Sequence, residues 1–228
     1  MLHRWTLRLA ALAAISLSGI LLLGSRFPGT SPPGNVQFAA LPAATAAQRV
    51  ATFAGGCFWS MQKAFDGVPG IVSVTAGYAG GSKASPSYQE VETGRTGHAE
   101  SVQVIYDPAR ISYEGLLDIY WHHIDPLTIN SAFCDHGPQY RSIIFYRDAE
   151  QQRLAEASKR ALDQSHRFST PIVTAIQPAT AFYPAEEYHQ QYYKKNPANY
   201  AAYRIGCGRD QRIRELWGDV ALSKGAGE

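Results

Sequence analysis

Hydrophobic and polar positions follow short periodic runs from residue 49 to the C-terminus. The run His98–Tyr106 alternates, with Glu100 on the same side as the apolar positions, and predicts a strand. Asp148 begins the clearest helical pattern. We predict strands over 49–56, 71–78, 98–106, 139–146 and 172–176, and helices over 57–65, 113–123, from 148 onward and over 185–194. This interleaving indicates an α/β or α+β sandwich in one domain and leaves the strand order open.

Residues 1–48 break this pattern. They contain three arginines and no acid, and their uncharged stretch 9–25 is short for a membrane span and long for the apolar part of a signal peptide. Ala44-Thr45-Ala46 resembles a signal-peptidase cleavage site. We predict that 1–48 is an export signal, cleaved near Ala46 or kept as a membrane anchor with a flexible linker. Residues 49–228 form the predicted domain, working in the periplasm or cell envelope.

Composition and charge exclude several classes of protein. Hydrophobic residues make up 45% of the 228, enough for a core, so the chain is not a disordered one. The net charge of +2 becomes −1 once residues 1–48 are set aside, and no nucleic-acid partner is expected. Three cysteines are too few for a disulfide scaffold. No H-E-x-x-H or C-x-x-C spacing occurs, and we predict no metal site.

The positions of two residues make them candidates for catalysis. Cys57 follows Gly55-Gly56 at a strand-to-helix turn, where a helix N-terminus is expected to lower the pKa of a thiol and favour a nucleophile; a structural buried cysteine is the alternative. Glu100 on an apolar strand face is either an acid with a raised pKa or a strand-end residue that reaches water, and the pattern leaves both open.

Two further segments are ambiguous when taken alone. The segment 135–142, with the sequence DHGPQYRS, gathers polar groups where a loop enters a strand, but by itself it is read as a capped turn. Tyrosines crowd the C-terminal third, and we interpret them as packing residues with solvated hydroxyls.

Five motifs in order resemble the peptide methionine sulfoxide reductase A family. They are GGCFW at 55–59, VTAGYAGG at 74–81, SYQEV at 87–91 with TGHAE at 96–100, DHGPQYRS at 135–142 and HQQYYKKNP at 189–197. The resemblance covers residues 49 to about 205. It implies a two-layer α/β sandwich, a single domain with a long irregular C-terminal tail.

The resemblance also implies roles for individual residues. Cys57 is the thiolate that attacks the sulfoxide sulfur, Glu100 is the acid, and Tyr88 and Tyr140 bind the oxygen. Asp135 fixes the polar network, while Phe58 and Trp59 form the apolar wall for the S-methyl group. The implied substrate is methionine S-sulfoxide, free or in proteins. The implied reductant is an external dithiol, thioredoxin or similar, and no cofactor is expected.

The cysteines depart from the family pattern. Many bacterial relatives have a resolving cysteine just after the Asn-Pro motif, where this chain has 199–201 without one, and Cys207 is the expected substitute. The role of Cys134 stays open. Two other functions compete. One is a papain-like cysteine hydrolase, because His189 lies 132 residues after Cys57. The other is a non-enzymatic exported module with structural cysteines.

Overall fold

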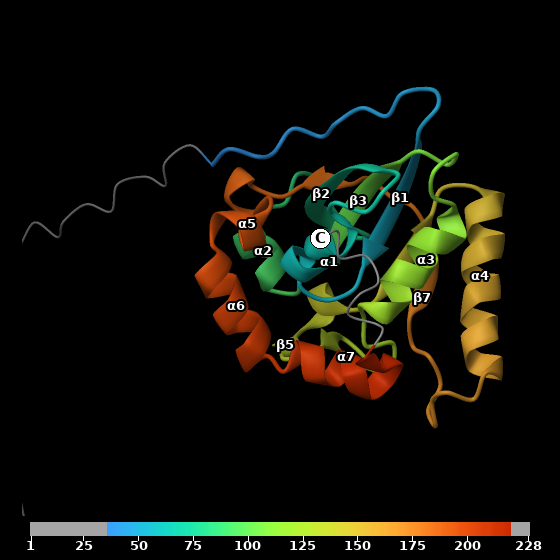
Figure 1. The fold of residues 1–228 in the computed structure, drawn as a ribbon. Helices are drawn as coiled ribbons and strands as arrows, with labels where there is room; N and C mark the ends of the chain where they lie inside the picture. The colour runs from blue at the N-terminus through green and yellow to red at the C-terminus, as the bar shows by residue number, and fades with distance from the viewer. Residues whose placement is uncertain (1–35, 220–228) are drawn as a thin grey trace, which may run out of the picture. The chain divides into compact units, whose positions relative to one another are not determined.

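The computed structural model describes residues 36–219, whose centre is a six-stranded sheet (Figure 1). The strand order is β7-β6-β1-β3-β2-β8, and all neighbours are antiparallel except β6 and β7. The strands are β1 (Arg49–Ala54), β2 (Ile71–Ala79), β3 (Ala99–Tyr106), β6 (Ile143–Tyr146), β7 (Ala175–Pro178) and β8 (Tyr183–Pro184). A separate hairpin pairs β4 (Ser131–Ala132) with β5 (Asp135–His136).

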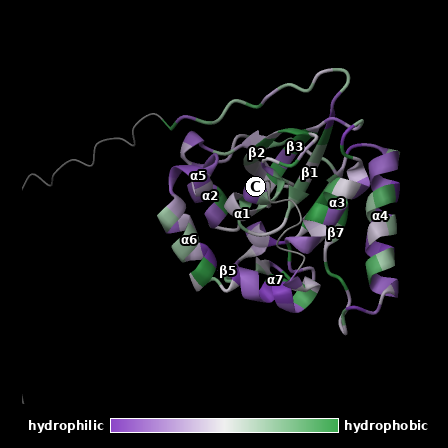
Figure 2. Ribbon diagram, in the orientation of Figure 1, coloured by the Kyte–Doolittle hydropathy of each residue, from purple (hydrophilic) through white to green (hydrophobic). Residues whose placement is uncertain are grey.

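Three helices build the main core against one face of this sheet. They are α1 (Phe58–Phe65), α3 (Tyr113–His122) and α4 (Ala149–Gln164). Phe53 of β1 stacks on rings from α1 and α3, and Val102 and Val104 of β3 lie in the same cluster. Figure 2 shows that α4 is mostly hydrophilic, in keeping with a helix that turns only a narrow apolar stripe inward. The predicted mixed α/β fold in one domain is confirmed.

Side-chain caps fix where several helices begin. Ser112 accepts a hydrogen bond from the Gly115 N–H ahead of α3, and Asp148 accepts one from Gln151 ahead of α4, as predicted for that residue. The short helix α2 (Tyr88–Glu92), for which no element was predicted, begins with a capping box between Ser87 and Glu90. The strand predicted over 139–146 is shorter, because Pro138–Tyr140 forms a 3-10 turn.

The C-terminal part differs most from the prediction. The tail expected to be irregular contains α6 (Pro197–Gly206) and α7 (Arg209–Trp217). The helix predicted over 185–194 is instead a 3-10 turn at Glu187–His189 and the short α5 (Tyr192–Lys195), since Gln191 has a left-handed backbone with φ 51°. Residues on both sides of this break are held by tertiary contacts, and those contacts override the helical pattern.

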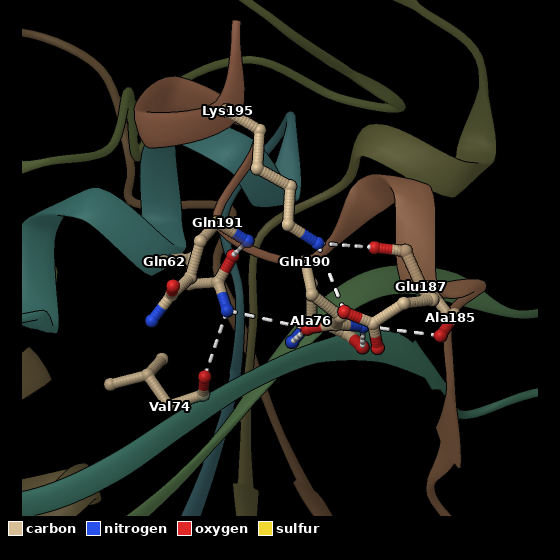
Figure 3. Close-up of polar contacts among 8 residues, drawn as sticks. All are labelled: Gln62, Val74, Ala76, Ala185, Glu187, Gln190, Gln191 and Lys195. Atoms are coloured by element: carbon tan, nitrogen blue, oxygen red, sulfur yellow. Dashed lines mark hydrogen bonds and ion pairs between the residues drawn. The ribbon is translucent and has the colours of Figure 1, made fainter. Parts of the chain in front are cut away.

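Buried amides provide those contacts (Figure 3). The Gln190 side chain donates to the carbonyls of Ala76 and Ala185 and accepts from the Ala76 N–H. The Gln62 side chain, from α1, donates to the Val74 carbonyl and accepts from the Gln191 N–H. Two glutamines therefore tie the segment around His189 to β2 and α1.

The start of the described chain also contacts the domain. The backbone N–H of Ala39 donates to the Ala185 carbonyl, and the Glu187 N–H donates to the Gln37 carbonyl. Residues 37–39 are thus paired with 185–187, although the sequence analysis placed them in a linker. The predicted signal or anchor at 9–25 lies outside the described residues. Between residues 36 and 219, no helix is long and apolar enough to cross a bilayer.

Candidate active site

The turn between β1 and α1 places Cys57 at the N-terminus of α1. Gly56 has φ +84°, and a Cβ there would lie 2.6 Å from the Cβ of Ala132; a Cβ on Gly55 would lie 2.5 Å from Ile124. Both positions therefore require glycine, which explains the GGC sequence in local terms. Cys57 is a free thiol and only 6% exposed.

Glu100 faces the same helix N-terminus from β3. Its Oε2 accepts a hydrogen bond of 2.9 Å from the Phe58 N–H, and the residue is 2% exposed. Burial raises the pKa of Glu100 to about 8, aided by the charges of Asp135 and Glu92 and opposed by the Phe58 hydrogen bond. Of the two interpretations left open by the pattern, the strand-end residue that reaches water is wrong. At neutral pH this carboxyl is mostly protonated and able to donate a proton.

Cys57 has a raised pKa, contrary to the expectation of a lowered one. Burial, followed by the charges of Glu100 and Asp135, raises the pKa of Cys57 to about 12, against lowering contributions from Tyr203 and Arg209. The first N–H of α1, which was expected to stabilise the thiolate, is instead taken by the Glu100 carboxyl. The first N–H of the helix therefore binds the Glu100 carboxyl and not the Cys57 sulfur.

These groups surround one cavity of about 150 Å³. Its lining residues are Cys57, Phe58, Trp59, Tyr88, Glu100, Asp135, Tyr140 and Tyr203. All seven residues predicted for catalysis and substrate binding are therefore gathered around one pocket, although they come from four separate stretches of sequence. The lining combines aromatic rings with a thiol, two carboxyls and three tyrosine hydroxyls. The roles assigned to these residues remain predictions.

Tyr203 is the lining residue that the sequence analysis did not select. It extends from α6, and its hydroxyl donates a 2.6 Å hydrogen bond to Oδ2 of Asp135. The same hydroxyl interacts with the Cys57 thiol. Burial and the neighbouring Cys57 and Asp135 raise the pKa of Tyr203, so its proton is retained. The crowd of C-terminal tyrosines was the available signal, but the sequence does not show which one turns inward.

The predicted wall residue Trp59 is held by His189, the histidine that the hydrolase alternative would pair with Cys57. Its indole N–H donates a 3.1 Å hydrogen bond to Nδ1 of His189, and its ring stacks on Tyr192 with centroids 3.9 Å apart. Burial lowers the pKa of His189 to about 4, which keeps the acceptor nitrogen free of a proton at neutral pH. The imidazole therefore orients an aromatic wall, which differs from the thiol–imidazole pair that a papain-like hydrolase needs.

Cys207 forms a disulfide with Cys134, with Cα atoms 5.0 Å apart. The expected pairing of Cys207 with Cys57 is thus replaced by a bond between the two other cysteines. Cys134 is exposed, whereas Cys57 is buried. Because Asp135 follows Cys134 directly and lines the pocket, the disulfide lies beside the cavity. A buried thiol, a protonated carboxyl and a neighbouring disulfide together define a thiol-dependent oxidoreductase site.

Comparison with known proteins identifies the family. The family model described as peptide methionine sulfoxide reductase matches residues 49–221. A peptide methionine sulfoxide reductase MsrA from Halalkalibacterium halodurans is 53% identical over 168 residues, covering 74% of this chain and 96% of the relative. An MsrA from Listeria monocytogenes serotype 4a is 52% identical over 167 residues, covering 73% and 94%.

Solved structures agree with this result. Methionine sulfoxide reductase A of Corynebacterium diphtheriae has a TM-score of 0.62 and 32% identity, covering 72% of this chain and 83% of that one. Reduced Mxr1 from Saccharomyces cerevisiae has a TM-score of 0.62 and 34% identity, covering 72% and 92%. The chain belongs to the peptide methionine sulfoxide reductase family. The predicted family and the predicted oxidoreductase class are confirmed, and the hydrolase and the non-enzymatic module are wrong.

Proposed function

We propose that the protein reduces methionine S-sulfoxide, free or in proteins, to methionine, with Cys57 as the nucleophile. The observation that carries this proposal is the pocket that joins the Cys57 thiol and the Glu100 carboxyl to an aromatic wall. A sulfoxide is polar at oxygen and apolar at its methyl group, so it needs both kinds of wall. Phe58 and Trp59 offer the apolar side, and Tyr88 and Tyr140 offer hydroxyls to the oxygen.

The reaction balances with the groups in the pocket. The Cys57 sulfur attacks the sulfoxide sulfur and Glu100 protonates the sulfoxide oxygen. The resulting hydroxyl passes to Cys57, while the proton released by the Cys57 thiol returns to Glu100. The products are methionine and a Cys57 sulfenic acid, so sulfur of the substrate is reduced as sulfur of the enzyme is oxidised. Protonation is needed because an unprotonated oxygen is a poor leaving group. The raised pKa of Glu100, about 8, supports this role at neutral pH.

Recycling uses both remaining cysteines. Cys207 attacks the sulfenic acid, water leaves, and a Cys57–Cys207 disulfide forms. Cys134 then attacks the Cys207 sulfur, which frees Cys57 and gives the Cys134–Cys207 disulfide. The presence of that bond beside the pocket supports this sequence, in which Cys207 keeps the predicted resolving role and Cys134 becomes the second redox residue.

An external dithiol closes the cycle. It attacks the exposed Cys134 side of the disulfide, leaves as its own disulfide, and returns two thiols to the protein. We propose thioredoxin or a thioredoxin-like protein for this step. Exposure supports the assignment, because a protein reductant reaches Cys134 far more easily than the buried Cys57.

We further propose that the reaction takes place outside the cytoplasm, in the periplasm or cell envelope. The arginine-flanked uncharged stretch at 9–25 supports export or membrane attachment. Under this proposal the protein repairs oxidised methionine in envelope proteins. Fractionation of cells expressing the full chain tests it: recovery of the protein only in the cytoplasm would contradict export.

A substrate assay tests the chemistry directly. The purified protein is given each epimer of a blocked methionine sulfoxide with dithiothreitol, beside a Cys57→Ser variant. We expect loss of the S epimer alone and no loss in the variant. Persistence of both epimers with folded protein would overturn the proposal.

Mass spectrometry after one addition of substrate tests the recycling order. With thioredoxin present, Cys134→Ser and Cys207→Ser are each expected to complete a first turnover and then slow at least tenfold. The Cys134→Ser protein is expected to accumulate a Cys57–Cys207 disulfide, and Cys207→Ser a Cys57 sulfenic acid. Normal steady turnover of Cys134→Ser would remove the second exchange step from the scheme.

A further inference from the structure

Arg209, the first residue of α7, has a completely buried side chain. Its Nη2 donates to the His123 carbonyl at 2.8 Å and, more weakly, to the Gly55 carbonyl at 3.4 Å. The guanidinium carbon lies 4.1 Å from the centre of the Phe133 ring. Nε and Nη1 have no hydrogen-bond partner among the described residues. Two of the three guanidinium nitrogens are therefore buried without a hydrogen-bond partner.

The charge of Arg209 is also unpaired. Nearby arginines on the same tail have carboxylate partners, since Arg204 pairs with Asp210 and Arg212 pairs with Asp125. Within residues 36–219 no carboxylate oxygen lies within ion-pair distance of Arg209. A buried cation without a counter-ion is costly, so its retention calls for a negative partner at some stage of the reaction.

The unpaired end of Arg209 is directed to the turn that carries Cys57. Nη1 lies 3.5 Å from the place that a Cβ on Gly56 would occupy, and Nη2 contacts the Gly55 carbonyl. The other titratable groups that act on Cys57 become negatively charged when they ionise. They are Glu100 from β3, Asp135 from β5 and Tyr203 from α6, together with Tyr140, whose own pKa is raised in part by Cys57. Among the groups that act on Cys57, Arg209 is the one that carries a positive charge.

We propose that Arg209 is a positioning residue whose buried charge is the counter-ion of the Cys57 thiolate. The inference rests on the proposed role of Cys57 as nucleophile. In the resting protein the charge of Arg209 lowers the pKa of Cys57 but does not overcome burial and the acids. The pairing gains strength as Cys57 loses its proton, because Coulomb attraction in a buried site is only weakly screened. The tail thus supplies a positive charge to the pocket as well as Cys207.

Alkylation of Cys57 by iodoacetamide measures thiolate formation without any sulfoxide. The full chain is used oxidised, where the Cys134–Cys207 bond leaves Cys57 as the free thiol, and the modified peptide is mapped. We compare Arg209→Met and Arg209→Gln, which lose the charge, with Arg209→Lys, which keeps it. Arg214→Met is the control, since this exposed cation lies on the same helix. Thermal melting of each variant confirms folding.

Loss of the charge is expected to raise the pKa of Cys57 by about one to two units. The alkylation rate at pH 8 then falls about three- to tenfold, since higher basicity partly offsets the smaller thiolate fraction. The alkylation rates of Arg209→Lys and Arg214→Met are expected to stay within about twofold of the rate of the unmodified chain. Equal or faster rates in Arg209→Gln would overturn the proposal, as would Arg209→Lys reacting as slowly as Arg209→Gln. If Arg209→Met fails to fold, the Gln–Lys pair decides. Because no turnover is measured, this result is independent of whether the sulfoxide assay succeeds.

Discussion

The two halves of the pocket are held in place by different means. Cys57 and Glu100 belong to β1–α1 and β3, where backbone hydrogen bonds of a buried sheet and the first turn of a helix position them. His189, Tyr203 and Arg209 come from the C-terminal region that follows the short edge strand β8. Side-chain hydrogen bonds, ring contacts and a disulfide hold this region in place. In the proposed mechanism the sheet half supplies the nucleophile and the acid. The tail half contacts Trp59 and Asp135 through hydrogen bonds and supplies Cys207.

This difference separates two kinds of requirement. The acid must stay buried to keep a raised pKa, and a central strand provides that burial. In the proposed mechanism the recycling cysteines reach both a buried thiol and an external reductant, which requires segments that are able to move past one another. A tail attached by side chains and one disulfide meets that need better than a strand in the middle of a sheet.

Removing the Glu100 acid is expected to have the largest effect on the chemistry of the sheet half. Glu100→Gln keeps the shape and a hydrogen-bond acceptor for the Phe58 N–H but has no proton to donate. We expect the single-turnover rate of sulfoxide reduction at pH 7 to fall about 10²- to 10⁴-fold. Rapid-quench assays with excess enzyme measure this step apart from recycling. Glu92→Gln, which also removes a nearby acid charge, is the matched control and should stay close to normal.

The same variant carries a pH signature. Glu100 is protonated below its pKa of about 8 and loses the proton as pH rises through that value. Its contribution to the single-turnover rate is therefore present at neutral pH and lost on the alkaline side. A falling limb near pH 8 is expected in the normal enzyme and absent in Glu100→Gln. A falling limb unchanged in the variant would assign it to another group.

The sequence predicts the sheet half of the pocket better than the tail half. Strand alternation placed Glu100 correctly on the helix-facing side of β3, and the Gly55-Gly56 turn placed Cys57 at the start of α1, because both depend on local backbone geometry. The direction of the pKa shift of Cys57 was predicted wrongly, because that direction depends on burial and on acids far away in sequence.

The tail was predicted least well for the same reason. Helical spacing over 185–194 was outweighed by the contacts of Gln190, and nothing local showed that Tyr203 faces the pocket or that Cys207 bonds to Cys134. The motif resemblance added the pocket residues as a set, yet it left the role of Cys134 open. Tertiary pairing across more than 70 residues has no counterpart in local periodicity.

Loss of the Gln190 amide tests how firmly the tail is attached. Gln190→Leu removes the side-chain acceptor of the Ala76 N–H and one of the two donors to each of the Ala76 and Ala185 carbonyls, so we expect the free energy of unfolding to fall by about 1–3 kcal/mol. Urea denaturation should show a lower midpoint with an unchanged slope. Gln191→Asn, at an exposed side chain whose left-handed backbone asparagine tolerates, is the control. An unchanged midpoint for Gln190→Leu would mean that the tail is held by other contacts.

The smallest expected effect concerns the hydrogen bond that joins the two halves. His189→Phe keeps an aromatic ring against Phe58 and Trp59 but removes the acceptor for the Trp59 indole N–H. Since a lost hydrogen bond of this kind is worth about 1 kcal/mol, we expect KM for the sulfoxide to rise about two- to tenfold with little change in the chemical step. His166→Asn, an exposed histidine on a distant turn, is the control.

The pH dependence shows whether the imidazole acts as an acceptor. Burial holds the pKa of His189 at about 4, so Nδ1 accepts from Trp59 above about pH 5 and is lost as an acceptor when the pH falls through 4. In the unmodified protein KM is therefore expected to be flat from pH 5 to pH 8 and to rise below that range. In His189→Phe the acidic rise should disappear. An equal rise in both proteins would place the effect on another group and would leave Tyr192 stacking as the main restraint on Trp59.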